Sequence, residues 1–444
     1  MIKLFKKVFF HKVGFLNIGY ISFYIGTFFL SSALPIALIF FIISIVIVIY
    51  KKKSEFFLKY DLLPLYFVSF LMVLGNFYSI YWSKPIELSK FDTSISWVSI
   101  LNWIPLFIAY RAFQFYLRTD KNKIDFINIL VAGTFPVIFS ILGQIWFHWN
   151  GPYSTLGDLI IWFQKPINFE NKNAIGGVAG LFSNPNYTAF WLSTIFPFSI
   201  FLFKSKSKFF EKFFSFLLIS TFIYCIILTD SRNGFLGILI GILITLGVKF
   251  LFIILLILFL ISIIYTLTKS FLPIFIYEFI NSFLQRGLIL KLSNLNILNI
   301  SQIGRVNIFQ NVFKLITAKP LFGWLAGSFP IMFLLVDPLK KEAIQHAHNL
   351  PLQLAYDYGL ITAIIICSFI LWLYINSSRI ILLNNNQTNN FLFFKTWMAS
   401  SYISIIFHVT DMPYYDGKIA ILFWIFLAGI KTYIDQDSNK TRSF

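Results

Sequence analysis

Two histidines and an asparagine stand directly before a long apolar run, in the segment 346–360 (HAHNLPLQLAYDYGL). Ionisable and strongly polar side chains are costly at the mouth of a membrane span, so their presence there indicates function. Imidazole titrates near neutral pH, and His348 is therefore our candidate general base. Asn349, Gln353 and Asp357 are spaced four residues apart, which predicts that they line one face of a helix.

These residues also allow plainer roles. Gln353 and Asp357 suit a polar seam that holds helices together by hydrogen bonds inside a bundle. His408 stands three residues before Asp411, and this spacing predicts a structural hydrogen-bonded pair rather than a catalytic one. His346 alternates with His348 as metal ligands sometimes do, but no cysteine or third ligand accompanies them, so we expect no metal and no other cofactor.

Two arginines add positive charge that suits a phosphate ligand. Arg232 lies in TDSRNG and Arg305 in IGRVN. Guanidinium groups hold phosphate oxygens in a bidentate manner and stay charged, so both arginines are candidate ligands of a lipid-linked pyrophosphate. Alternatively, each is an interfacial arginine that reaches lipid head groups, and Asp230 simply pairs with Arg232.

A further candidate lies in LFSNPNYTAF at 181–190. Asn184 followed by Pro185 is a helix-start pattern, with asparagine as the cap and proline at the first helical position. Asn186 faces outward in the same segment, where it can hydrogen-bond a sugar or a phosphate.

The composition places these residues in a membrane protein. Of 444 residues, 58% are hydrophobic and 12% are charged, whereas soluble domains carry about 25% charged residues. The net charge of +18 falls in short clusters between apolar runs, which indicates topology and binding to anionic lipids rather than to nucleic acid. Cys225 and Cys367 lie in apolar runs, so neither a disulfide framework nor a cysteine metal site is expected.

An apolar stretch of about 20 residues is needed to span a bilayer, and we count about twelve. Basic residues mark every second loop, which predicts that both termini are cytoplasmic and that the long loop 269–350 is periplasmic. The first apolar helix is expected to be retained rather than cleaved as a signal. The expected spans are 15–33, 34–50, 62–82, 96–117, 126–148, 187–203, 213–229, 233–248, 250–268, 351–375, 395–411 and 418–434.

We expect three regions: N-terminal transmembrane helices at 1–180, a core at 181–375 that includes the long loop, and C-terminal transmembrane helices at 376–444. Within the loop, residues 304–320 have a helical rhythm. Phe309, Val312, Phe313 and Ile316 recur at spacings of three and four. This predicts an amphipathic helix on the outer membrane surface.

In this order the motifs resemble those of the O-antigen ligase and polymerase superfamily of bacterial membrane glycosyltransferases. The resemblance covers residues 181–362. It departs from the family at Asp357, where glutamate is usual, and at Trp324 and Ala326, where further glycines are common. The matching residues are His348, Asn349, Gly359 and Thr362 of the ligase signature, Ser231 with Arg232, Gly304 with Arg305, the turn from Gly323 to Gly327, and the Asn184–Asn186 segment.

The resemblance implies an all-α integral membrane protein with a GT-C-like arrangement and an active periplasmic face. It further implies transfer of a saccharide from undecaprenyl pyrophosphate to a hydroxyl of an acceptor, either a lipid such as the lipid A core or a growing glycan. His348 would be the base, and Arg232 and Arg305 the pyrophosphate ligands. Asn349, Asn186 and Asp357 would be supporting polar groups.

Two other functions remain open at this point. A secondary transporter, for example of inorganic carbon, would need a polar path through the whole bundle and often shows inverted repeats. We find no repeat, and the candidate residues gather on one side. A membrane scaffold in cell-envelope assembly would tolerate the loss of both arginines.

Overall fold

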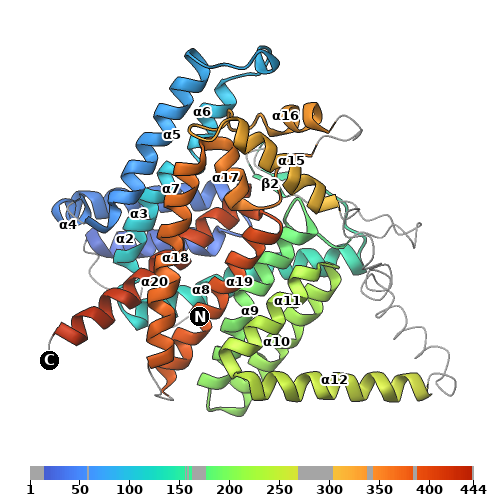
Figure 1. Cartoon of the computed structure of the whole chain (residues 1–444). Helices are drawn as coiled ribbons and strands as arrows, with labels where there is room; N and C mark the ends of the chain where they lie inside the picture. Colours follow the sequence, from blue (N-terminus) through green and yellow to red (C-terminus); the bar gives the residue numbers. More distant parts are fainter. Residues whose placement is uncertain are drawn as a thin grey trace. The chain divides into compact units, whose positions relative to one another are not determined.

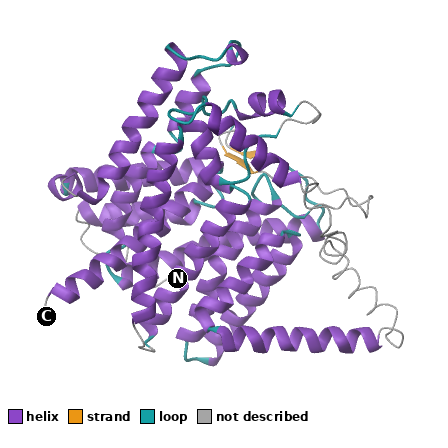
Figure 2. Cartoon of the chain, in the orientation of Figure 1, coloured by secondary structure: helices purple, strands orange, loops and turns teal. Residues whose placement is uncertain are grey.

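The computed structural model describes residues 15–57, 60–155, 157, 160–162, 177–268, 304–337, 344–383 and 388–442. Apart from one short hairpin of strands β1 (Tyr153–Thr155) and β2 (Ile160–Trp162), the described secondary structure is helical (Figure 1, Figure 2). The chain is a multi-pass membrane protein. Eight helical segments of the described chain are long and apolar enough to cross a bilayer: Leu34–Lys51, Leu63–Tyr81, Ser94–Tyr116, Asp120–Trp146, Pro185–Ser205, Phe209–Leu228, Leu360–Leu383 and Gly417–Ser438.

The chain forms two compact units. Unit 1 comprises Met1–Gly133, Ser301–Asn385 and Ile405–Phe444, and unit 2 comprises Thr134–Ile300 and Asn386–Ser404. The helices α8 (Asp120–Trp146) and α19 (Asn389–Thr410) each contribute residues to both units. The remaining helices of unit 1 are α2 (Phe15–Phe29), α3 (Leu34–Lys51), α4 (Lys53–Phe57), η1 (Tyr60–Leu62), α5 (Leu63–Tyr81), η2 (Ile86–Leu88), α6 (Ser94–Ile100), α7 (Ile104–Tyr116), α15 (Gly304–Ala318), α16 (Phe329–Val336), α17 (Leu350–Tyr358), α18 (Leu360–Leu383), η4 (Pro413–Tyr415) and α20 (Gly417–Arg442).

The core of unit 1 is built around α20, which packs between α7 and α18. Most of its span is buried, unlike α3 and α5, whose exposed apolar faces suit contact with lipid. Aromatic side chains fill the joint between α20 and the segment that leads into it. Tyr414 stacks on Trp103 with ring centroids 4.2 Å apart, and its hydroxyl accepts a hydrogen bond from Trp424 Nε1. These contacts fix the loop that follows α19.

Two glycines let the α15–α16 connection cross the joint between α17 and α18. Gly359 has φ of +88°, and an added Cβ atom there would lie 2.0 Å from the carbonyl oxygen of Leu321. Gly323 has φ of +68°, and its added Cβ atom would lie 2.4 Å from the carbonyl oxygen of Tyr356. Only glycine has both the backbone freedom and the small size for such an approach. The crossing fixes α15 against α17.

Unit 2 is centred on α9 (Pro185–Ser205), which is buried at every residue from Thr188 to Phe201. The helix α11 (Arg232–Leu246) packs closely against it through Gly234, Gly237 and Gly241. Small residues at a helix interface permit such close packing in membranes. The unit also contains α10 (Phe209–Leu228) and α12 (Val248–Thr268), and the side chains of α12 that the structure describes are largely exposed and apolar.

Most expected spans agree with observed helices to within a few residues, but two are interrupted. The predicted helix 96–117 is α6 followed by α7, with a turn at 101–103, and the predicted helix 351–375 breaks at Gly359 into α17 and α18. Four of the twelve expected spans correspond to α2, α11, α12 and α19. These helices are not among the eight described segments that are long and apolar enough to cross a bilayer. Within the expected long loop, residues 269–303 and 338–343 lie outside the described part of the chain.

Candidate active site

His348 and Asp411, which are 63 residues apart in the chain, form the centre of the candidate site in unit 1. The Nδ1 atom of His348 lies 3.1 Å from Oδ1 of Asp411. The carboxylate is nearly buried, whereas the imidazole is 30% exposed. His348 adopts a left-handed backbone conformation, with φ of +51°. Such conformations are uncommon in residues other than glycine and often occur at functional sites.

Arg305 meets the same carboxylate from the first turn of α15. Its Nη1 donates a hydrogen bond of 2.6 Å to the carbonyl oxygen of Thr410, and its Nη2 lies 3.7 Å from Oδ1 of Asp411. The arginine side chain remains 45% exposed. One carboxylate oxygen therefore orders both the imidazole of His348 and the guanidinium group of Arg305. Both side chains stay partly accessible to a ligand.

The role of Asp411 differs from the sequence prediction. The spacing of His408 and Asp411 predicted that these two residues pair. In the structure Asp411 pairs instead with His348 and Arg305. The His408 ring instead stacks on Phe423, with centroids 4.7 Å apart. Asp411 was therefore missed as a candidate site residue. Its partners lie far away in the sequence, and the only signal was an acidic residue at the end of an apolar run.

Asn349 anchors the loop that carries His348. Its Oδ1 accepts a hydrogen bond from the Leu352 amide at 3.0 Å and so caps the first turn of α17. Asparagine is a preferred residue at this position. The Nδ2 atom of Asn349 donates to the carbonyl oxygen of Val409 at 2.9 Å, at the end of α19. Asn349 thus joins the segments that carry His348 and Asp411.

Asp357 lies at the centre of a buried polar network in α17, before the membrane span of α18. Gln353 Nε2 donates to one carboxylate oxygen at 3.0 Å, and the Tyr415 hydroxyl donates to the other at 2.6 Å. Gln353 Oε1 in turn accepts from the Ala347 amide. Burial raises the pKa of Asp357 to about 7, against the lowering effect of the hydrogen bonds from Tyr415 and Gln353. These contacts support the plainer role considered for Gln353 and Asp357, a polar seam that holds the segments together by hydrogen bonds.

His346 packs beside His348, with ring centroids 4.4 Å apart. Its Nδ1 accepts a hydrogen bond of 3.3 Å from the backbone amide of His348. Burial, together with the neighbouring imidazole, lowers the pKa of His346 to about 4, so its ring is neutral at pH 7. Among the described residues, no group of three or more histidine, cysteine, aspartate or glutamate side chains is arranged to hold a metal ion.

Arg232 and Asn186 belong to unit 2, where each lies in the first turn of a helix. Arg232 is exposed and begins α11, directly after Ser231, whose side chain caps that helix. Asn186 is half-buried in α9, and its backbone amide donates to Asn184 Oδ1 at 2.9 Å. The predicted capping role of Asn184 is confirmed. The positive end of each helix dipole lies at these residues, which favours nearby anions.

The comparison with known families supplies the deciding observation: residues 214–367 match the model of the family described as O-Antigen ligase. This segment is a domain of the O-antigen ligase family, here called the O-antigen ligase domain. No curated protein matches the chain. The O-antigen ligase domain contains Arg232, Arg305, His348, Asn349 and Asp357, and the family consists of membrane enzymes of the O-antigen ligase or polymerase type, which act on lipid-linked glycans.

Asp411 lies outside the matched segment, as does Asn186. The O-antigen ligase domain therefore receives an acidic partner for its histidine from the C-terminal part of the chain. The carboxylate is placed by the left-handed Met412 and by the aromatic packing of Tyr414 against Trp103.

Proposed function

We propose that the protein transfers a saccharide from undecaprenyl pyrophosphate to a hydroxyl group of an acceptor lipid or glycan, at the periplasmic face of the bacterial cytoplasmic membrane. The observation that carries this proposal is the cluster of His348, Asp411 and Arg305, which combines a candidate base, a group that orients it and a candidate phosphate ligand. The O-antigen ligase domain supports the choice of substrate class.

In this mechanism His348 is the general base. Its Nδ1–H donates to Asp411, which leaves Nε2 free to accept the proton of the acceptor hydroxyl. The hydroxyl oxygen attacks the anomeric carbon, and the bond from that carbon to the pyrophosphate oxygen breaks, so that undecaprenyl pyrophosphate leaves with the bonding electron pair. Asp411 stabilises the imidazolium ion that forms. An acidic partner has this effect in other histidine-dependent enzymes.

The leaving pyrophosphate gains negative charge, and a fixed cation lowers the energy of that step. We assign this role to Arg305, whose guanidinium group is ordered by Thr410 and Asp411 but remains partly exposed. Arg232 is assigned a second phosphate contact, and Asn186 a hydrogen bond to the sugar or phosphate. Both assignments depend on residue chemistry and on their motifs. Asn349 and Asp357 support the loop that carries His348.

The proposed topology has both termini in the cytoplasm and the His348 loop in the periplasm, because the basic loops alternate along the chain. The carrier chain would then remain in the bilayer while the sugar lies in water. The reaction as proposed needs neither metal nor nucleotide sugar.

The test is glycan transfer by the purified protein in liposomes, with a radiolabelled saccharide on undecaprenyl pyrophosphate and a hydroxyl-bearing acceptor. His348→Ala should reduce the rate by about 10²- to 10⁴-fold, the usual contribution of a general base. The matched control is His148→Ala, a histidine outside the O-antigen ligase domain. Normal transfer by a folded His348→Ala protein would exclude this mechanism. Solute uptake into vesicles in place of transfer would favour the transporter.

A further inference from the structure

The exposed side of α15 carries a line of residues that begins at the candidate active site. Arg305, Phe309, Phe313 and Thr317 are spaced four apart, and such residues lie along one face of a helix. At 1.5 Å of rise per residue, Phe313 lies about 12 Å along the helix axis from Arg305. A cationic side chain is therefore followed by two aromatic rings in a fixed direction away from His348.

The two phenylalanines are not needed for packing in the way that their neighbours are. Ile308, Val312, Leu315 and Ile316 are buried and form the inner face of the helix. Phe313 is 61% exposed, and Phe309 is half-buried. The sequence pattern assigned Phe313 to the same apolar face as Val312 and Ile316, but the structure separates them. Because the two rings follow directly from Arg305, they form an apolar surface that is open to a ligand or to membrane lipid.

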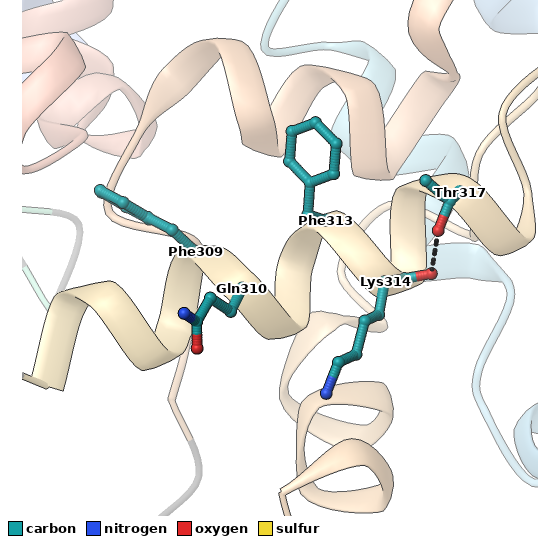
Figure 3. A pocket seen from close by; sticks show the side chains of 5 residues that line it. All are labelled: Phe309, Gln310, Phe313, Lys314 and Thr317. Carbon is teal, nitrogen blue, oxygen red and sulfur yellow. Dashed lines mark hydrogen bonds between the residues drawn. The ribbon is translucent and has the colours of Figure 1, made fainter. Parts of the chain in front are cut away.

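A pocket of about 570 Å³ lies over this line, and its walls are Phe309, Gln310, Phe313, Lys314 and Thr317. Figure 3 shows Phe309 and Phe313 one turn apart on α15, with Gln310 and Lys314 directed to another side of the helix.

The hydroxyl of Thr317 and the amine of Lys314, two polar groups of this pocket, have partners within the helix. The Thr317 hydroxyl donates to the carbonyl oxygen of Lys314, and Lys314 Nζ donates to Asn311 Oδ1 at 3.4 Å. Gln310 and Lys314 are directed to another side of the helix (Figure 3), so the surface that Phe309, Phe313 and Thr317 present to a ligand is mainly aromatic rings and a methyl group. A saccharide would lose hydrogen bonds to water here without replacement, whereas a hydrocarbon chain would not. The chemistry of the pocket therefore favours a hydrocarbon.

We propose that the isoprenoid units nearest the diphosphate of the carrier lie against Phe309 and Phe313 while the diphosphate is bound at Arg305. This inference depends on the proposed function and adds a carrier-binding surface to it. The order of groups along the helix, cation first and apolar rings after it, matches the order of groups along a polyprenyl diphosphate. A bilayer phospholipid also joins a phosphate to hydrocarbon, but only the carrier must place its diphosphate near His348 for the proposed reaction, so the continuity with Arg305 favours the carrier.

The first test compares two donors that carry the same saccharide, one on undecaprenyl diphosphate and one on ethyl diphosphate. Phe309→Ala and Phe313→Ala should each raise KM for the undecaprenyl donor by roughly tenfold, the effect of losing part of a buried aromatic contact, and leave KM for the ethyl donor unchanged. Phe70→Ala is the control, because Phe70 is 60% exposed on the membrane helix α5. It should change neither value. Equal effects on both donors, as expected if α15 only anchors the protein to lipid, would overturn the inference, as would no effect.

A second test does not require transfer. Undecaprenyl diphosphate with a diazirine on its first isoprenoid units should label the peptide that contains residues 305–314 of the wild-type protein upon irradiation. Unlabelled undecaprenyl diphosphate should compete, phosphatidylglycerol should not, and Phe313→Ala should reduce labelling severalfold. Labelling that phosphatidylglycerol abolishes would assign the surface to bilayer lipid. If labelling is observed but wild-type transfer is absent, the proposed reaction fails while the carrier-binding surface stands.

Discussion

The Nδ1 atom of His348 lies 3.1 Å from Oδ1 of Asp411, and the same oxygen lies 3.7 Å from Nη2 of Arg305. A nearly buried carboxylate thus connects the O-antigen ligase domain to the end of α19. Because one oxygen serves two partners, a change at Asp411 affects the orientation of the imidazole and that of the guanidinium group together.

Asp411→Asn should therefore lower the transfer rate strongly while the protein still folds. An amide can occupy the same space, but it cannot stabilise an imidazolium ion by charge, and it can leave the wrong tautomer of His348. We expect a loss of about 100-fold or more in kcat, with a smaller change in KM. The measurement is transfer kinetics in liposomes. Asp337→Asn is a suitable control, since Asp337 is a half-buried carboxylate that accepts a hydrogen bond from Asn307 Nδ2 and does not contact His348 or Arg305 through an ion pair. Equal kcat values for the two variants would contradict the proposed role of Asp411.

Arg305→Lys should bind the donor more weakly than the wild-type protein, and Arg305→Ala more weakly still. Lysine keeps the charge but not the planar fork that binds two phosphate oxygens at once. We expect KM for the donor to rise by about tenfold for lysine and by about 100-fold for alanine, in line with the loss of one or two charge-assisted hydrogen bonds. Arg379→Ala, which removes an exposed arginine from α18, serves as the control. If neither Arg305→Lys nor Arg305→Ala raises the donor KM above that of the Arg379→Ala control, Arg305 does not bind the phosphate.

Asp357 predicts a pH dependence of stability. Burial raises its pKa to about 7 in the folded protein, whereas the unfolded value is about 4. The folded state therefore holds the proton more tightly, and the free energy of unfolding should fall as pH rises from about 4 to about 7. Asp357→Asn stays neutral and should lose less stability over that range. Thermal unfolding in detergent between pH 4 and pH 8 measures the difference. A wild-type Tm that follows the variant in parallel across the range would disprove the prediction.

Gly359→Ala should be far more damaging than Gly247→Ala. Both glycines have φ near +90°, but an added Cβ atom meets the Leu321 carbonyl oxygen at 2.0 Å in the first case and nothing within 4 Å in the second. The control then carries only the backbone cost, about 1–2 kcal/mol, while Gly359→Ala must also displace the α15–α16 connection. We expect lower Tm and lower activity for Gly359→Ala. Similar Tm losses in the two variants would mean that the crossing is easily rearranged.

The membrane orientation can be tested with fusions to reporters that are active on one side only. A fusion after Ser207, between α9 and α10, should report the cytoplasm, and one after Asp337 should report the periplasm. The opposite result at residue 337 would place His348 on the wrong side for the proposed reaction.

The sequence predicted the helices well because apolar length and basic loops are local properties. It also predicted that Asn349, Gln353 and Asp357 share a face, and the hydrogen bond from Gln353 to Asp357 agrees with that. The break at Gly359 was not predicted, because the apolar pattern continues through it. Its cause is the backbone of Leu321, nearly 40 residues away in the sequence.

Pairings between distant segments were the harder part. Spacing alone suggested that Asp411 pairs with His408, since the two are close in the sequence, but tertiary packing directs the His408 ring onto Phe423 and the carboxylate toward His348. Periodicity alone likewise could not tell which apolar residues of α15 face inward. Phe313 and Val312 are adjacent and equally apolar, yet one is exposed and the other buried.

The position of Asp411 beyond residue 367 has a practical consequence for protein engineering. A recombinant fragment that ends with the matched segment would retain its imidazole and both arginines yet lack the anion that holds two of them in place. Swapping C-terminal helices between homologous proteins would therefore exchange part of the proposed catalytic apparatus, not merely a membrane anchor.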